Sequence, residues 1–195
     1  MIYLNDDIEK LPLKEALQQI SEQRREQALK FKYELGQRLS VAAYLLLKEG
    51  LRQEYGITGN PVFAYTEHGK PSIQGHPEIF FNLSHCRQGA ICAIGRGPIG
   101  VDIESIREYR ESLVAYTMNG EEKAQIERAP NPAVEFIKLW TMKESLLKLT
   151  GTGISTDMKD VLTNTQLRYR HTTVVNQQRG YVWSVCEARE VKDDE

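Results

Sequence analysis

The segment from Gly100 to Glu104 constrains the fold more than any other part of the chain. Its alternation predicts a strand on which Val101 and Ile103 point to one side, and Asp102 and Glu104 to the other. Acidic residues are depleted in strands, and two carboxylates on one face repel each other. A hard divalent cation, which binds carboxylate oxygens, would turn that repulsion into a binding site. The segment therefore predicts a sheet with one apolar face and one cation-binding face.

A second segment, from Trp140 to Lys148, predicts a helix. Trp140, Glu144 and Lys148 stand four residues apart on it and share one face. Taken alone, a Glu–Lys pair at this spacing is typical of a solvated helix face. We expect Trp140 to anchor the helix in the core rather than take part in chemistry. Lys143, one step around the helix, is expected to be a solvated or structural lysine.

Composition narrows the class of protein. The chain has 195 residues, of which 41% are hydrophobic and 27% charged, as in an ordinary soluble globular protein. A net charge of −2 gives no electrostatic reason to expect nucleic acid or an anionic membrane as a partner. Three cysteines without metal-ligand spacing predict free thiols in a reducing compartment, and neither a signal peptide nor a membrane span is expected. We therefore expect a cytoplasmic protein.

The order of predicted elements is helices followed by strands, twice over. The first half has helices at 13–32 and 35–55 and strands at 1–4, 62–65, 79–83, 90–94 and 99–104, with residues 95–98 as a hairpin connection between the last two. In the second half we expect helices at 113–117, 121–128 and 133–149, and an antiparallel strand pair at 167–175 and 181–188. The junction between the halves falls after Glu104, which gives the units 1–104 and 105–195.

The two segments described first resemble the signatures of the 4′-phosphopantetheinyl transferases, through the motifs Gly-x-Asp-x-Glu (100–104) and Trp-x-x-Lys-Glu-x-x-x-Lys (140–148). The stretches Gly69-Lys70-Pro71 and Asn82-Leu83-Ser84-His85 match further motifs in the same order. The match is closest to the larger, surfactin-type group. This resemblance implies an α+β fold of two similar lobes, 1–104 and 105–195, related by a pseudo-twofold, with the active site in the cleft between them.

The resemblance also implies a reaction. The 4′-phosphopantetheine group of coenzyme A would pass to a serine of an apo-acyl or peptidyl carrier protein, releasing adenosine 3′,5′-bisphosphate. Such a transfer depends on positioning and electrostatics, so the site needs a hard cation, lysines and a carboxylate base. Mg²⁺ is the expected cation, and Mn²⁺ could replace it. Because both lobes lie on one chain, we expect a monomer.

The resemblance assigns roles to acidic residues. Asp102, Glu104 and Glu121 are the implied metal ligands, with Glu122 as a rival to its neighbour. The alternative for both glutamates is a pair at a helix N-terminus, favoured by the helix dipole. Glu144 matches the general base that takes the serine proton, directly or through a metal-bound water.

Coenzyme A contacts are implied for basic and motif residues. Lys148 would hold a phosphate, and Lys70 and Pro71 would lie against the adenine and a nearby phosphate. Ser84 and His85, at an exposed strand end, would contact phosphates.

Recognition of the 3′-phosphate is the open question at the N-terminus. Arg24 and Arg38 match basic positions of the family, but Gln27 stands where the family usually has another basic residue. Lys30 or Arg25 could compensate for it.

Two other functions use the same residues. A metal-dependent hydrolase of the coenzyme A pyrophosphate would take water as the nucleophile, although the sequence has no second metal cluster or hydrolase motif. A non-catalytic module that binds coenzyme A or a carrier protein would need no base, so the joint presence of Asp102, Glu104, Glu144 and Lys148 argues against it. The sequence does not identify the carrier protein.

Overall fold

The computed structural model describes residues 1–67, 69–152, 157–163, 165 and 168–189. A first series of elements runs through β1 (Ile2–Asn5), the 3₁₀ helix η1 (Ile8–Lys10), α1 (Leu13–Gln18), α2 (Glu22–Leu29), α3 (Glu34–Tyr55), β2 (Phe63–Tyr65), β3 (Pro71–Ile73), β4 (Phe80–Cys86) and β5 (Gly89–Gly95). The second runs through β6 (Ile99–Ser105), α4 (Glu111–Thr117), α5 (Gly120–Arg128), α6 (Pro132–Thr150), β7 (Tyr169–Asn176) and β8 (Tyr181–Ala188).

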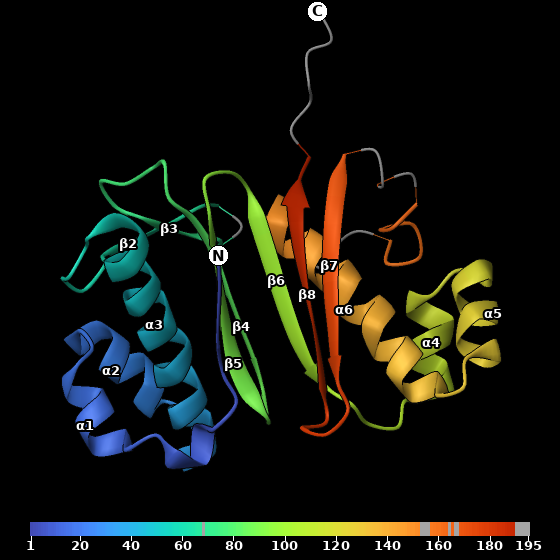
Figure 1. The fold of residues 1–195 in the computed structure, drawn as a ribbon, viewed down its shortest axis with the longest axis horizontal. Helices are drawn as coiled ribbons and strands as arrows, with labels where there is room; N and C mark the ends of the chain where they lie inside the picture. Colours follow the sequence, from blue (N-terminus) through green and yellow to red (C-terminus); the bar gives the residue numbers. More distant parts are fainter. Residues whose placement is uncertain (68, 153–156, 164, 166–167, 190–195) are drawn as a thin grey trace, which may run out of the picture.

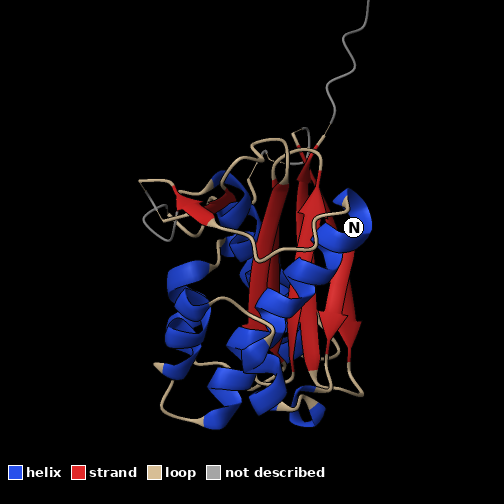
Figure 2. Cartoon of the chain, turned by 90° about the vertical axis from the view of Figure 1, so that its left-hand side faces the viewer, coloured by secondary structure: helices blue, strands red, loops and turns tan. Residues whose placement is uncertain are grey.

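Two three-stranded antiparallel sheets form the middle of the molecule, in the orders β1-β5-β4 and β6-β8-β7. The long helix α3 packs against the first sheet and α6 against the second, while β2 and β3 form a separate small hairpin. Figure 1 shows the resulting layers, with helices on the outside and the sheets between them. Seen from the side of α1 and α2, the N-terminal helices lie in front of the strands (Figure 2). The α+β prediction is confirmed, and the pseudo-twofold stays a prediction.

The core follows these layers. Between the sheets, Ile91 on β5 packs in one cluster with Val101 and Ile103 on β6 and Val185 on β8. Further clusters join α3 to the first sheet and α6 to the second. The apolar face predicted for residues 100–104 is therefore the face between the sheets, since Val101 and Ile103 are fully buried. Asp102 and Glu104 consequently point the other way, toward α6.

The helix predicted over residues 13–32 is in fact two helices, so that prediction was wrong. Helix α1 ends at Gln18, and α2 begins after Ser21. Ser21 caps α2, because its hydroxyl accepts a hydrogen bond from the backbone N–H of Arg24 at 3.3 Å. A serine within a helical pattern favours such a cap over continuation of the helix.

The connection at residues 95–98 is not a hairpin, in contrast to the prediction. Strand β5 pairs with β1 and β4, whereas β6 pairs with β8, so the connection crosses from one sheet to the other. Local sequence indicates only that two strands follow each other, because pairing depends on partners far along the chain. One consequence is that β6 belongs to the second sheet, although the predicted boundary after Glu104 puts it in the first unit. The short strand β3 was not predicted.

Among the described helices, none combines the length and the apolar character needed to cross a bilayer.

Candidate active site

The two sheets approach each other where β4 lies beside β6, and side chains rather than a backbone ladder join these strands. Asn82 Oδ1 accepts a hydrogen bond from Val101 N at 3.1 Å, and Ser84 Oγ accepts one from Ile103 N at 3.4 Å. Both side chains are buried, so the prediction that Ser84 is exposed at a sheet edge was wrong. The structural role of Asn82 was missed. An asparagine inside a strand, where this residue is uncommon, was the available signal.

Gly100 allows α6 to lie directly on β6. A Cβ atom at this position would stand 1.9 Å from Ser145 O and 2.5 Å from Leu149 N, closer than any packed atoms can be. Any other residue would therefore push the helix away from the strand. Close contact here brings Glu144 and Lys148 of α6 over the polar face of β6. The sequence offered a signal, since a glycine in a strand interior often marks a close approach of backbone.

Three polar groups from three elements meet at this contact. Lys148 Nζ on α6 donates to Asp102 Oδ1 on β6 at 2.6 Å and to Ser84 Oγ on β4 at 3.0 Å. Ser84 donates its own hydroxyl proton to Asp102 Oδ1 at 2.9 Å. The Asp102 side chain is 5% exposed and the Lys148 side chain 30% exposed, so this ion pair is accessible only from the lysine side. The structure thus brings together three of the residues that the motifs singled out.

Two further carboxylates stand beside this group. Burial raises the pKa of Glu144, and the negative charge of Asp102 raises it further, while Lys148 opposes the effect. Burial also raises the pKa of Glu104, with additional contributions from Asp102 and Glu144, against the lowering effect of Arg107 and Lys148. Both glutamates are therefore held as bases stronger than ordinary carboxylates. We call Asp102, Glu104, Glu144 and Lys148 the acidic cluster.

The acidic cluster has free acceptor capacity. Asp102 Oδ2 and Glu144 Oε1 are buried and have no hydrogen-bond partner in the described part of the chain. A buried carboxylate oxygen without a partner is costly, and a cation would satisfy it. Within the described residues, no three Asp, Glu, His or Cys side chains converge as a complete set of metal ligands. The residues fit Mg²⁺, which is typically bound by one or two carboxylates together with water and substrate phosphate oxygens.

Glu121 and Glu122 lie apart from the acidic cluster. Glu121 is exposed near the start of α5. Glu122 is buried, forms a capping box with Asn119 and pairs with Lys143 Nζ at 2.7 Å. The alternative of a pair at a helix N-terminus describes both positions, and Glu144 rather than Glu121 is the third carboxylate near Asp102. Ligation by Glu121 stays a prediction.

The residues predicted to hold coenzyme A occupy different settings. Lys70 is half-buried and donates to Leu149 O, at the end of α6, at 2.6 Å. Pro71 begins β3. His85 is exposed with its ring edge near Phe31, and its pKa is lowered by desolvation and then by the charge of Lys148. Lys70 thus contacts the C-terminal end of α6, and His85 lies close enough to Lys148 and Asp102 to respond to their charges.

Arg24 and Arg38 differ in how far they are already engaged. The guanidinium of Arg24 lies 5.1 Å from the ring centre of Tyr44, donates to Gln27 Oε1 at 2.6 Å and leaves its buried Nε without a described partner. Gln27 therefore orients Arg24. Arg38 instead binds Glu34 at 2.6 Å and the carbonyl oxygens of Glu9 and Leu11, which fixes α3 to η1.

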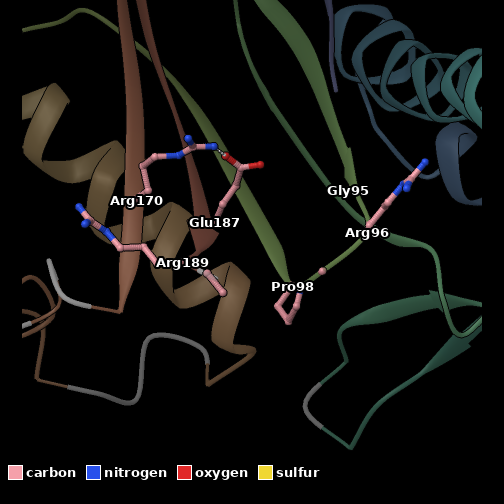
Figure 3. A pocket seen from close by; sticks show the side chains of 8 residues that line it. Gly95, Arg96, Pro98, Arg170, Glu187 and Arg189 are labelled. Carbon is pink, nitrogen blue, oxygen red and sulfur yellow. Dashed lines mark hydrogen bonds and ion pairs between the residues drawn. The ribbon is translucent and has the colours of Figure 1, made fainter. Parts of the chain in front are cut away.

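Two cavities flank these elements. One, of about 620 Å³, begins at Glu104 and has the aromatic side chains of Tyr109, Tyr116, Phe136 and Trp140 in its walls. A larger one, of about 860 Å³, is lined by the 95–98 connection and the ends of β7 and β8. Its arginines do not converge, because Arg170 turns toward Glu187 while Arg96 and Arg189 point away from each other (Figure 3).

Comparison with known proteins agrees with the motifs. The family model described as the 4′-phosphopantetheinyl transferase superfamily matches residues 98–192, a span that contains the acidic cluster. The 4′-phosphopantetheinyl transferase psf-1 of Bacillus pumilus is 30% identical over 70% of this chain and 60% of its own length. The 4′-phosphopantetheinyl transferase gsp of Aneurinibacillus migulanus is 35% identical over 59% of this chain and 49% of its own length.

A third relative aligns over more of its own length. The 4′-phosphopantetheinyl transferase ffp of Bacillus subtilis is 26% identical over 87% of this chain and 83% of its own length. With the first relatives, by contrast, the chain spans between about half and three fifths of the relative's length. The predicted family is confirmed, including the surfactin-type group. From its motifs and these matches, the chain belongs to the 4′-phosphopantetheinyl transferase superfamily.

Proposed function

We propose that this protein transfers the 4′-phosphopantetheine group of coenzyme A to a serine of an apo-carrier protein and releases adenosine 3′,5′-bisphosphate. The observation that carries this proposal is the acidic cluster. It combines carboxylates of raised pKa, an ammonium group and two buried oxygens that have no partner among the described residues, at one contact between β4, β6 and α6. A phosphoryl transfer needs the same combination of cation site, base and positive charge.

Asp102 and Glu104 are the proposed protein ligands of Mg²⁺, with Mn²⁺ as a substitute. Their neighbour Glu144 adds negative charge, and Glu121 is the family-based candidate for a further ligand. When bound, the cation supplies positive charge that offsets the charge of the pyrophosphate and of the leaving phosphate. Asp102 Oδ2 supports this assignment, because it is buried and lacks a partner among the described residues.

Glu144 is the proposed general base. Its raised pKa favours acceptance of the proton from the serine hydroxyl as the oxygen attacks the β-phosphorus of coenzyme A. Lys148 would hold the phosphate that is attacked, after exchanging its contact with Asp102 for the phosphate oxygens. Both residues lie on one face of α6, so a single rigid helix positions the base and the ammonium group.

Coenzyme A is proposed to lie along the first sheet, with Lys70, Pro71, Ser84 and His85 near its adenine and phosphates. Arg24 is the better candidate for its 3′-phosphate, because Arg38 is already engaged with Glu34 and two carbonyl groups. Ser84 is proposed to act through its hydrogen bond to Lys148, since its side chain is buried.

The carrier protein is proposed to present its serine through the cavity that begins at Glu104. Its walls are rich in aromatic side chains, which are typical of protein-binding surfaces, and Tyr116 is 71% exposed. We further propose a two-lobed monomer that acts in the cytoplasm. The three buried free cysteines support a reducing compartment.

The test is incubation of the purified chain with coenzyme A, Mg²⁺ and a panel of apo-carrier proteins, followed by intact-mass analysis of each carrier. The proposal predicts a carrier that gains the mass of phosphopantetheine. If coenzyme A is consumed while every carrier keeps its mass, the protein is a hydrolase. If neither changes, the protein is a binding module, and the proposal fails in both cases.

A further inference from the structure

The middle of α6 contains polar side chains where a core helix usually has apolar ones. Thr141, Lys143 and Ser145 are all 0% exposed. They stand two residues apart in sequence, and Glu144 lies between the last two. Buried lysines are rare, because an ammonium group loses its hydration and must be compensated by the protein. An apolar side chain could fill the same space without this cost. Core packing alone therefore does not account for these polar residues.

Lys143 is the most completely bound of the three. Its Nζ donates to Glu122 Oε2 at 2.7 Å, to Thr117 O at 2.9 Å and to Met158 O at 2.6 Å. An ammonium group has three protons, and each has an acceptor here. The acceptors belong to α5, to the end of α4 and to the segment after α6. One side chain thus fixes α6 to three separate parts of the second half.

The acceptor Glu122 is itself held in place. Its Oε2 accepts from Asn119 N at 2.9 Å, and Asn119 Oδ1 accepts from Glu122 N at 2.9 Å, which closes the capping box of α5. Asn119 Nδ2 donates in turn to Lys159 O at 3.2 Å. Glu122 therefore cannot follow Lys143 if α6 rotates. The contact between Lys143 and Glu122 therefore holds α6 at one rotation relative to α5.

Other polar contacts define the same rotation of α6 from the side of the sheet. Thr141 Oγ1 lies 2.8 Å from Ser184 Oγ on β8, and a ring nitrogen of His171 on β7 lies 3.2 Å from Met142 O. Hydrogen bonds are directional, whereas apolar contacts tolerate small rotations and slips. Residues 141–143 are thus bound on two sides, directly before Glu144.

We propose that Lys143 is a positioning residue, which acts through its buried contact with Glu122 to fix the rotation of α6 and thereby the place of Glu144 over β6. This inference rests on the proposed transferase function. It assigns no contact with substrate to Lys143, because the side chain is enclosed. A displacement of about 1 Å at a catalytic group can cost roughly a hundredfold in rate, so the loss of this contact is expected to lower kcat.

The test compares Lys143→Met, Lys143→Arg and the double variant Lys143→Met/Glu122→Gln with the wild type. The double variant leaves no unpaired buried charge and keeps an oxygen for the capping box, so it is expected to fold even if Lys143→Met does not. Lys138→Met is the matched control, since Lys138 pairs with Glu135 at 2.8 Å on the same helix but is 34% exposed. Each variant is measured for kcat, for coenzyme A affinity by calorimetry and for Tm.

The proposal predicts that kcat of the double variant falls at least about tenfold, while its coenzyme A Kd stays within about threefold and its Tm stays above the assay temperature. Lys143→Arg should recover part of kcat, and Lys138→Met should match the wild type. A double variant with wild-type kcat would overturn the proposal, as would a loss of kcat confined to variants that are partly unfolded at the assay temperature. If the wild type and Lys138→Met both fail to transfer phosphopantetheine, the proposed function has failed instead.

Discussion

At the scale of single residues, the site depends on carboxylates that are held in an unfavourable state. Glu144 is half-buried beside Asp102, and one of its oxygens has no partner among the described residues. The desolvation cost of such a carboxylate is typical of functional groups, because a carboxylate can act as a base only if its oxygens are not already hydrogen-bonded. Activity and stability should therefore respond in opposite directions when Glu144 is changed.

The first prediction concerns the opposite effects of a change at Glu144 on activity and on stability. Glu144→Gln keeps the volume but cannot accept a proton, so kcat should fall by about two to four powers of ten. The folded-state pKa of Glu144 is raised above its ordinary value of 4.5, so the stability gained from its protonated form is lost as pH rises through that pKa. At pH 7 the variant should thus have the higher Tm, and the difference should vanish below pH 4. Wild-type kcat in the variant would contradict the assignment.

The second prediction concerns recognition of the 3′-phosphate of coenzyme A by Arg24. Loss of a charged partner commonly costs about 1.5–3 kcal/mol, so 3′-dephospho-coenzyme A should be a poorer donor by at least tenfold in kcat/KM. Arg24→Ala should remove most of that difference, whereas Lys148→Ala should impair both donors alike. Equal rates with the two donors in the wild type would show that Gln27 has left the 3′-phosphate without a contact.

At the scale of elements, the contact between α6 and β6 decides whether the site forms. The strand and the helix were each predicted from local periodicity, and their bounds lie within a few residues of those observed. Their contact was not predictable from that pattern, because it depends on the absence of a Cβ atom at Gly100 and on the ion pair between Lys148 and Asp102. Local periodicity predicts the elements, and tertiary contacts bring their reactive side chains together.

The third prediction tests this contact. Gly100→Ala places a Cβ atom 1.9 Å from Ser145 O, so the helix must move or the protein must lose stability by about 1–3 kcal/mol. The transfer activity of Gly100→Ala should fall as well. Gly97→Ala is the control, because a Cβ atom there meets no atom of the described residues within 4 Å. Urea unfolding and initial rates of both variants check the prediction, which fails if Gly100→Ala and Gly97→Ala behave alike.

At the scale of the whole molecule, the two halves are connected at both ends of their interface. Lys70 reaches Leu149 O at one place, and Arg179 pairs with Asp6 and Asp7 at another. These contacts join residues that are 79 to 173 positions apart in sequence, which no local pattern could predict. The α+β class and the family were predictable because the motifs are specific. The burial of Ser84, the enclosure of Lys143 and the place of β6 in the second sheet were not, because each depends on a distant partner.

A fourth prediction concerns the cation. An excess of chelator should abolish transfer by the wild type, and added Mg²⁺ or Mn²⁺ should restore it, because the buried oxygens of Asp102 and Glu144 need positive charge before a pyrophosphate can approach. Calorimetric titration with Mn²⁺ in the presence of coenzyme A should show binding to the wild type. Full activity in chelator would exclude the metal assignment.

The most direct measurement compares the rate of carrier-protein mass gain for the wild type, Asp102→Asn and Glu187→Gln. Asp102→Asn keeps the shape of the side chain and an acceptor for Ser84 but removes the charge on which the acidic cluster depends. Glu187 is an acid on the same sheet that pairs with Arg170 away from the cluster. We expect normal transfer with Glu187→Gln and a loss of at least about a hundredfold with Asp102→Asn. Normal transfer by Asp102→Asn would show that the acidic cluster is not the site of the reaction.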